Sequence, residues 1–147
     1  MKNFVIKEVS LDEAIKVHRK ITEFYNHNEP KEYFTERYGN KNKLIIVAYL
    51  NNSPAGYLIG YDKSNDGSFY CWIVGVDPEY RQMGILKKLM DYLIKWAKKQ
   101  GYKKIKLSTW NSFRAMLSYL VKYNFMFVKV IPGKTTENNQ IKLEKDI

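Results

Sequence analysis

The stretch from Val76 to Leu86 has the residue types and spacing of a binding site for an anion. Its apolar start predicts a strand that ends before Pro78, and a short loop with Gly84 then leads directly into a helix. This arrangement directs unpaired backbone N–H groups and the positive end of the helix dipole towards one point. Gly84 has no Cβ to keep a ligand away from the backbone. The segment therefore predicts a site for a phosphate-like group.

The same segment excludes two other phosphate-binding loops. No Gly-Lys-Ser or Gly-Lys-Thr follows it, so it is not a P-loop, and the G-x-G-x-x-G pattern of dinucleotide-binding proteins is absent. One alternative stays open, in which Gly84 only caps the helix of an ordinary strand-to-helix loop. The two hypotheses differ in whether the loop binds a ligand.

The positive charge of the chain is concentrated in its second half. The net charge is +10; residues 1–80 contain ten Lys/Arg and eleven Asp/Glu, whereas residues 81–147 contain fifteen and four. A basic half indicates an anionic partner such as nucleic acid, an acidic membrane or a phosphorylated cofactor. The alternative is a solvated, lysine-rich helix face without a partner.

Length and composition are those of a single globular domain over residues 1–147. The 147 residues are 45% hydrophobic, which excludes a disordered tail or a coiled coil. The longest apolar run, Ile45 to Leu50, is too short to cross a bilayer, and the N-terminus does not resemble a signal peptide. Cys71 is the only cysteine, which excludes an internal disulfide and a cysteine-based zinc site. We therefore expect a cytoplasmic protein without a membrane segment or a bound metal.

Hydrophobic periodicity predicts a mixed α/β (α+β) sheet with helices on both faces. Ser10 and Glu13 form a capping-box pattern, after which apolar residues recur at helical spacing as far as Tyr25. A strand, a helix and a strand between residues 68 and 109 form a βαβ unit, whose strands should be parallel. The expected strands cover residues 4–9, 44–50, 55–61, 68–76, 104–109, 125–131 and 140–143, with a hairpin loop at 51–54 and further helices at 30–39, at 84–100 and from 113. The expected order is β-α-α-β-β-β-α-β-α-β-β.

The pattern Val76-x-Pro78-x-Tyr80-Arg81-x-x-Gly84-Ile85 resembles motif A of the GCN5-related N-acetyltransferases, the GNAT family. The expected element order is also that of the family, so the resemblance extends over the whole chain and implies a single-domain GNAT-like fold. It implies acetyl-CoA as the acetyl donor, with the loop binding the pyrophosphate of the cofactor. Arg81, Gly84 and Ile85 match the motif, and the amides implied to bind the pyrophosphate are those of Gln82, Met83, Gly84, Ile85 and Leu86, with Arg81 beside them. Leu86 departs from the family pattern, which has a small residue there.

The strand before this loop is implied to bind the pantetheine arm of the cofactor. In the family this strand is bulged, diverges from the next strand and pairs with the cofactor along its free edge. The matching edge runs from Ile73 to Val76, with Val74 and Val76 as cofactor-binding positions and Gly75 as the expected place of the irregularity. The resemblance also implies that a backbone N–H near Val76 stabilises the oxyanion.

A second region resembles motif B of the family. It consists of Ser108 to Asn111, a following helix, and the pair Asn124-Phe125. The resemblance implies that Asn111 contacts the cofactor, although Asn111 equally fits the N-cap of the helix. Asn124 replaces the usual glycine of the family, and asparagine also adopts the left-handed conformation that ends a helix.

The resemblance points to a catalytic tyrosine without fixing its position. Family members often carry a tyrosine four residues before that glycine, where it protonates the departing thiolate. Here that register falls on Leu120, and counting forward from motif B falls on Ser118. Tyr119 lies between the two registers and is the expected general acid. The alternatives are Tyr123, one turn later, and a thiolate that leaves without an acid.

The sequence thus predicts an acetyl-CoA-dependent N-acetyltransferase that acts directly on a primary amine, with no acyl-enzyme at Cys71 and no assigned general base. The acceptor, a small molecule or a peptide, is not identified. Aromatic residues of the first half together with Glu29, Glu32 and Glu36 are candidates for a pocket that binds a cationic amine, or else are ordinary core and surface positions.

The second hypothesis is a non-catalytic module that binds acyl-CoA or nucleic acid on the same fold. Nucleic acid is not the expected partner, because a nucleic-acid binder should interleave basic and aromatic residues on one sheet face. A homodimer is compatible with the resemblance, since dimers are common in the family.

Overall fold

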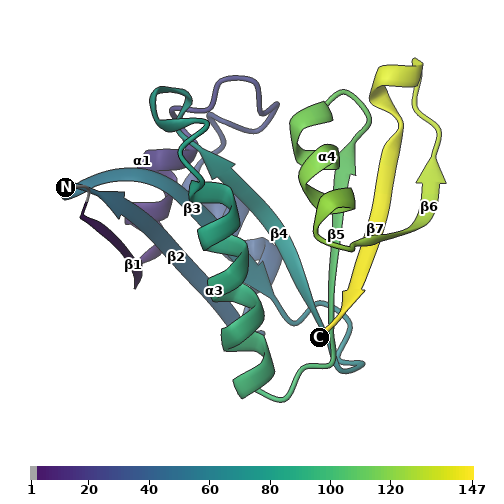
Figure 1. The fold of residues 1–147 in the computed structure, drawn as a ribbon, viewed down its shortest axis with the longest axis horizontal. Coiled ribbons are helices and arrows are strands. Elements are labelled where there is room, and N and C mark those ends of the chain that lie inside the picture. Colours follow the sequence, from purple (N-terminus) through teal and green to yellow (C-terminus); the bar gives the residue numbers. More distant parts are fainter. Residues whose placement is uncertain (1–2) are drawn as a thin grey trace.

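The computed structural model describes residues 3–147 and contains a mixed sheet of seven strands with helices on both faces (Figure 1). The expected order of strands and helices is confirmed, with two short 3₁₀ helices added at Pro78–Tyr80 and Thr136–Asn138. The elements are β1 (Phe4–Glu8), α1 (Leu11–His18), α2 (Lys31–Tyr38), β2 (Lys43–Leu50), β3 (Ser53–Tyr61), β4 (Ser68–Val76), α3 (Ile85–Lys99), β5 (Lys104–Trp110), α4 (Arg114–Lys122), β6 (Met126–Ile131) and β7 (Gln140–Asp146).

The strands lie in the order β1-β2-β3-β4-β5-β7-β6. Strands β1 to β4 form an antiparallel meander, and β4 and β5 are parallel, as the βαβ unit predicts. The last strand, β7, lies between β5 and β6 and is antiparallel to both. It continues to Asp146, beyond the expected end at residue 143, because it pairs with β5 along its whole length.

The sheet separates two hydrophobic cores. Along β2, Leu44 and Ile46 pack towards α3 and α4, whereas Ile45 and Val47 pack towards α1 and α2. This alternation buries β2 on both faces, which explains its nearly continuous apolar sequence. In Figure 1, α3 and α4 cover the near face, and α1 lies behind the sheet.

Helix α1 begins where the capping residue predicts and ends earlier than expected. Ser10 is the N-cap, and its Oγ accepts a hydrogen bond from the N–H of Glu13 at 3.4 Å. The helix ends at His18, so the expectation that it continues to Tyr25 is wrong, and Tyr25 is 77% exposed. The chain after His18 forms turns instead, because the imidazole of His18 hydrogen-bonds the carbonyl of Asn26 and holds the segment folded back.

Turn residues adopt the backbone conformations that their types favour. Asn51 and Asn52 have φ of +50° and +68°, so the β2–β3 hairpin turns on two residues and β3 begins at Ser53, earlier than expected. Asn124, after α4, has φ of +69°, the left-handed conformation predicted for this substitute for glycine.

Candidate functional site

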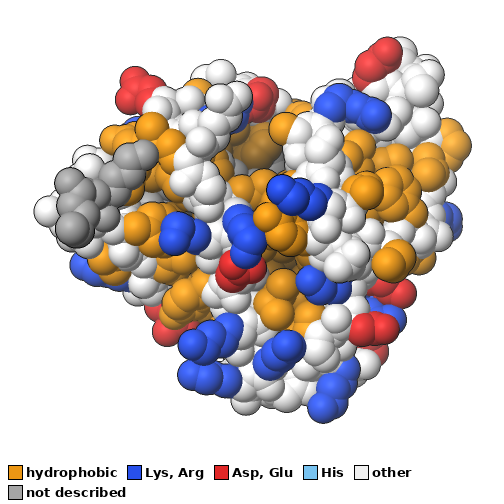
Figure 2. Space-filling model, viewed as in Figure 1, with side chains coloured by type: hydrophobic (Ala, Val, Ile, Leu, Met, Phe, Trp, Pro, Cys, Tyr) orange, Lys and Arg blue, Asp and Glu red, His pale blue; other side chains and the backbone are white. Residues whose placement is uncertain are grey.

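Strands β4 and β5 are paired over only part of their length. Their parallel register joins Ser68–Cys71 to Lys104–Leu107. Beyond these residues the strands diverge and form a V (Figure 1). The surface is hollowed between the end of β4 and α4, with hydrophobic side chains on its floor (Figure 2). Among residues 3–147, the divergence leaves β4 with β3 as its only neighbouring strand from Trp72 to Val76.

A β-bulge lies where the divergence begins. Ile59 of β3 faces Ile73, but the next residue, Gly60, faces Cys71, so Trp72 is an additional residue of β4. A bulge bends its strand and increases the local twist. It therefore turns the second half of β4 away from β5.

Gly75 is not the site of this irregularity, so that expectation is wrong. Gly75 pairs regularly with Tyr57 of β3. Glycine is needed there for packing, because a Cβ at this position would lie 2.5 Å from Cδ1 of Ile21 and 2.9 Å from the Tyr57 ring. The absence of a side chain at Gly75 lets the segment after α1 pack close to the sheet.

The free edge of β4 presents hydrogen-bonding groups of two predicted residues. The N–H of Asp77 donates to the carbonyl of Ala55 on β3 at 2.9 Å. Because the N–H and C=O of one residue share a side and the sides alternate along a strand, those of Val76 and Val74 point away from β3. This edge is available to an extended ligand that pairs with it as an added strand.

The loop after β4 collects free backbone donors. No backbone carbonyl or side chain of residues 3–147 accepts a hydrogen bond from the N–H groups of Gln82 to Leu86, and α3 has no side-chain cap. Gln82 and Gly84 have φ of +63° and +77°. A Cβ at Gly84 would meet no atom within 4 Å, so glycine serves the positive φ of the helix cap and leaves the donors uncovered. The sequence-based anion site therefore has the donors it requires, and Gly84 also caps α3; whether the loop binds an anion stays a prediction.

Arg81 lies at the side of this loop. Its guanidinium forms an ion pair with Glu23, in the segment after α1, and its Nε donates to the carbonyl of Val76 at 3.3 Å. The sequence carries no local signal for Glu23, because only the fold brings it next to Arg81.

The same segment reaches across the V. The rings of Phe24, after α1, and Phe113, at the start of α4, are 5.9 Å apart between centroids. This contact joins the two sides of the V at its open end. It also has no local sequence signal.

Asn111 joins two loops near the end of β5. Its Nδ2 donates to the carbonyl of Thr136 at 3.1 Å, and its Oδ1 accepts from Arg114 at 2.8 Å. The N-cap of α4 is Phe113, so the alternative of Asn111 as the N-cap is wrong. Its contact with a cofactor stays a prediction.

Tyr119 lies half-buried on α4, against the core beneath the V. Its ring is 4.7 Å from that of Tyr123. Burial, and then the negative charge of Asp91, raise the pKa of Tyr119 well above its usual value, so its hydroxyl stays protonated at neutral pH. Cys71, where β4 leaves β5, is also buried, which raises the pKa of its thiol to about 12. Such a thiol is a poor nucleophile, in agreement with its expected lack of a role.

The nearest acid–base groups on the α1 side have structural partners. His18 is fully buried, donates from Nε2 to the carbonyl of Asn26 at 2.9 Å, and accepts from the Tyr57 hydroxyl at Nδ1. Burial lowers the pKa of His18, so it is neutral. Asp77 is buried, caps the 3₁₀ helix and lies 3.7 Å from Lys20. Both groups therefore have partners within the fold.

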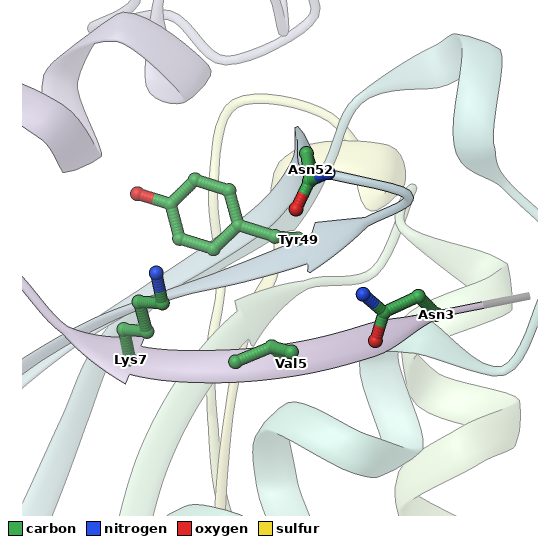
Figure 3. A pocket seen from close by; sticks show the side chains of 5 residues that line it. All are labelled: Asn3, Val5, Lys7, Tyr49 and Asn52. Atoms are coloured by element: carbon green, nitrogen blue, oxygen red, sulfur yellow. The ribbon is translucent and has the colours of Figure 1, made fainter.

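A separate hollow of about 270 Å³ lies at the other edge of the sheet, against β1 and β2 (Figure 3). Lys7 lies over the ring of Tyr49 there, at 5.4 Å from its centroid. The lining residues are Asn3, Val5, Lys7, Tyr49 and Asn52. They include no carboxylate, imidazole or thiol, so the hollow does not have the groups of a catalytic site.

Two kinds of feature are absent from residues 3–147. No group of three or more His, Cys, Asp or Glu residues is arranged to hold a metal ion. No helix in this range is long and apolar enough to cross a membrane.

Comparison with known proteins relates this geometry to a family. Residues 13–125 match the family model described as Acetyltransferase (GNAT) family. No curated protein sequence matches the chain significantly.

Several solved structures share the fold over nearly their full lengths. The ribosomal-protein-S18-alanine N-acetyltransferase from Escherichia coli gives a TM-score of 0.81 at 17% identity, over 99% of this chain and 94% of that one. Ard1 from Thermoplasma volcanium gives 0.79 at 19%, over 98% and 97%. A Bacillus subtilis acetyltransferase in complex with CoA gives 0.75 at 17%, over 100% and 99%. At these identities the similarity shows the fold.

Proposed function

The chain belongs to the GNAT acetyltransferase family and uses acetyl-CoA, and we propose that it transfers the acetyl group directly to a primary amine. One observation carries the proposal: the free edge of β4 continues directly into a loop of free N–H donors at the start of α3. An extended arm that ends in phosphates requires this combination of an unpaired strand edge and an anion-binding helix terminus.

Each residue named from the sequence then binds one part of acetyl-CoA. Val74 hydrogen-bonds the pantetheine arm through its carbonyl and Val76 through its N–H, because the Val76 carbonyl accepts from Arg81. The N–H groups of Gln82, Met83, Gly84, Ile85 and Leu86 bind the pyrophosphate, with Arg81 beside them. Asn111 contacts the arm from the β5 side of the V. The basic second half of the chain supplies long-range attraction for the phosphates.

The transfer needs an oxyanion donor and a group that stabilises the departing sulfur. Acetyl-CoA supplies a thioester: the amine nitrogen bonds to its carbonyl carbon, the carbon–sulfur bond breaks, sulfur leaves as a thiolate, and the nitrogen releases a proton to solvent. The N–H of Val74 also points to the open edge and lies nearer the vertex than that of Val76, which adjoins the pyrophosphate loop, so Val74 is the donor proposed for the oxyanion.

Tyr119 is the group proposed to stabilise the departing sulfur. Its raised pKa keeps its proton in place, while a thiol has a pKa of about 8.5. Tyr119 therefore stabilises the thiolate by donating a hydrogen bond, and full proton transfer to sulfur is not required. Cys71 lies at the vertex of the V next to it and does not take part.

Two measurements test the proposal. CoA at one hundred times its Kd should stabilise the protein against unfolding by about 2.7 kcal/mol, and a panel of amines screened by thiol detection should include one that releases CoA. Absence of any stabilisation at millimolar CoA would contradict donor binding. Stabilisation without CoA release from any amine would favour the non-catalytic module.

A further inference from the structure

Three aromatic rings form a cluster beside the bulge of β4, on the face of the sheet that carries α2. Tyr61 lies 5.7 Å from Tyr70 and 6.1 Å from Trp72 between ring centroids, edge to face in both cases. Trp72 is the additional residue of the bulge, so the cluster adjoins the point where β4 leaves β5.

Each ring of this cluster carries a cation. The guanidinium of Arg37 lies 5.0 Å above Trp72, and its Nε donates to the Tyr61 hydroxyl at 2.9 Å. Lys63 Nζ lies 4.4 Å from the centre of the Tyr70 ring, and Lys41 Nζ lies 5.8 Å from that of Tyr61. Aromatic faces attract cations, but they do not neutralise them.

A fourth cation faces the cluster from the other side of the V. Ile141 and Leu143 of β7 point into the core of α3 and α4, so Lys142 points to the opposite face. Its partner on β5 is Ser108, two residues after Lys106, which is the partner of Tyr70 on β5. Lys63 is close enough to the other cations for them to lower its pKa, after the larger effect of burial; they are Arg37, Lys142 and Lys41.

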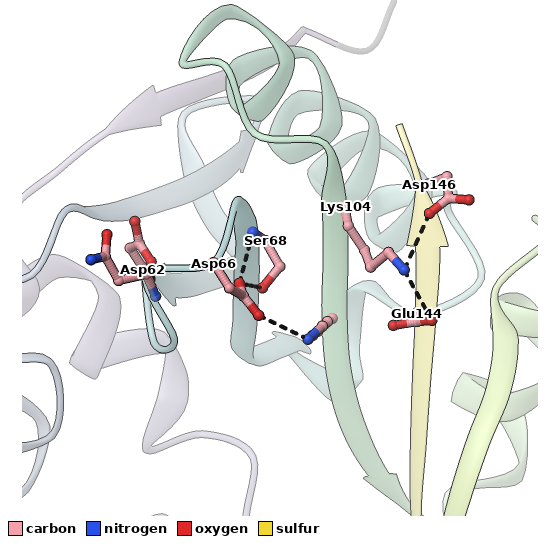
Figure 4. A network of polar contacts seen from close by, with 8 residues as sticks. Asp62, Asp66, Ser68, Lys104, Glu144 and Asp146 are labelled. Carbon is pink, nitrogen blue, oxygen red and sulfur yellow. Dashed lines mark hydrogen bonds and ion pairs between the residues drawn. The ribbon is translucent and has the colours of Figure 1, made fainter.

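The carboxylates of this region have partners outside the cluster; Asp62 accepts from the N–H of Asn65 and from the Tyr102 hydroxyl. Asp66 bonds Ser68 and Lys106, while Glu144 and Asp146 both pair with Lys104 (Figure 4). Among residues 3–147, no carboxylate lies within 4 Å of the charged nitrogens of the cluster. The four cations therefore lack a counter-ion from the protein.

We propose that the acceptor is a small amine that also carries a carboxylate or phosphate group, and that this group binds between Arg37, Lys63 and Lys142 beside the bulge. The inference rests on the proposed function, because it places the acceptor at the vertex of the V. The Nη groups of Arg37 have no acceptor among residues 3–147 and are free for an anionic oxygen. Glu29, Glu32 and Glu36 are exposed, and cations rather than carboxylates lie over these rings, which argues against the alternative of a pocket for a cationic amine.

The cations are not placed for the phosphates of the donor. The donor loop follows Val76, about 20 Å along β4 from Tyr70 at the rise of an extended strand. It also leads into α3, on the opposite face of the sheet.

Single-stranded nucleic acid is the less suitable occupant. Bases stack on open, flat aromatic faces. Here the rings meet edge to face, and the faces of Tyr70 and Trp72 are covered by Lys63 and Arg37. The cluster therefore offers charge to an anion, but no stacking platform.

The test compares four amines of similar length at saturating acetyl-CoA: propylamine, 1,3-diaminopropane, β-alanine and O-phosphoethanolamine. The better of the two anionic amines should exceed propylamine in kcat/KM by about tenfold or more, as one charge-assisted contact allows. Comparison of β-alanine with O-phosphoethanolamine distinguishes the two anionic groups. Equal values for propylamine and the anionic amines, or preference for diaminopropane, would overturn the proposal.

Variants test whether the preference for an anionic amine depends on the lysines of this cluster. Lys63→Met and Lys142→Met should each reduce the ratio of kcat/KM between the anionic amine and propylamine by about fivefold or more. Lys98→Met removes an exposed lysine of α3 on the other face and should leave the ratio unchanged. An equal change in all three variants would show a general charge effect and contradict the site.

A binding measurement separates failure of this proposal from failure of the proposed function. Inorganic phosphate, titrated without acetyl-CoA and followed by Trp72 fluorescence with Trp72→Phe as the blank, should bind the wild type and bind Lys63→Met/Lys142→Met at least about fivefold more weakly. This result supports the anion site even if no amine is acetylated. No phosphate binding, or binding of an oligonucleotide at this cluster in preference to phosphate, would overturn the proposal while CoA binding remained intact.

Discussion

Among residues 3–147, the first half of β4, from Ser68 to Cys71, pairs with β5, and its Tyr70 and Cys71 also pair with β3. After Cys71, β4 pairs with β3 alone. The first half is also buried more completely. Ser68, Phe69 and Cys71 are at most 5% exposed, while most residues of the second half are partly exposed. One strand thus has a structural half and a half with free backbone groups, and the bulge at Trp72 separates them.

The difference indicates how a stable sheet supplies an open binding edge. An exposed strand edge is normally a liability in a soluble protein. Here the free edge lies inside a V whose sides are held together by the paired half below it and by the contact of Phe24 with Phe113 above it. Substitutions in the paired half should therefore change folding, and substitutions at the open half should change binding or turnover.

The largest expected effect is on the paired half. Phe69→Ala removes a fully buried ring that packs 4.9 Å from Trp96 and 5.0 Å from Tyr102, and should lower the free energy of unfolding by about 3–5 kcal/mol. Val74→Ala, on the open half, should cost about 1 kcal/mol. Urea unfolding measures both, and equal losses would contradict the division of the strand.

Turnover should respond most strongly to the tyrosine beside the vertex. Tyr119→Phe should lower kcat by about 10²-fold and leave the Kd for CoA nearly unchanged, because only the departing sulfur loses a hydrogen bond. Steady-state kinetics and a CoA titration measure the two quantities. Tyr123→Phe is the matched control, and a larger effect of that variant would transfer the role to Tyr123.

Two glycines with the same backbone requirement distinguish folding from binding. Gly84 and Gly101 flank α3 with φ of +77° and +93°, and a Cβ at either position meets no atom within 4 Å. Gly84→Ala and Gly101→Ala should therefore each cost about 1 kcal/mol of stability. Only Gly84→Ala should also raise the Kd for CoA, by about tenfold. An unchanged CoA affinity in folded Gly84→Ala would contradict the pyrophosphate loop.

The smallest expected effect is a pH dependence of stability caused by His18, which bonds Tyr57 next to the open half of β4. Tyr57 pairs with Gly75, and its hydroxyl donates a hydrogen bond to His18. Burial lowers the pKa of His18 from its usual value of 6.5. The unfolded state therefore binds more protons than the folded state below about pH 6.5. Stability should fall as the pH is lowered through that value, by at most about 1.4 kcal/mol per pH unit for this one group.

Urea midpoints between pH 8 and pH 5 measure this dependence. His18→Gln should flatten it, because Gln cannot take up the proton, whereas His27→Gln should leave it in place. A dependence that persists in His18→Gln would assign the effect to other groups.

Local signals in the sequence determined which elements form and several of their ends. The Ser10 cap, the glycines that flank α3 and the left-handed Asn124 each depend on contacts within a turn or two, so neighbouring residues specify them. The order of strands and helices and the donor loop after Val76 follow from the same kind of signal.

The tertiary structure alone decided what comes from pairing between distant segments. The bulge at Trp72 rather than Gly75 is set by the register against β3, and the early end of α1 is set by the bond from His18 to Asn26. The pair of Arg81 with Glu23 and the cluster of Arg37, Lys63 and Lys142 join residues from separate elements. Such contacts depend on which side chains the folded sheet brings together. A sequence pattern reports the periodicity of one segment and carries no information on its distant neighbours.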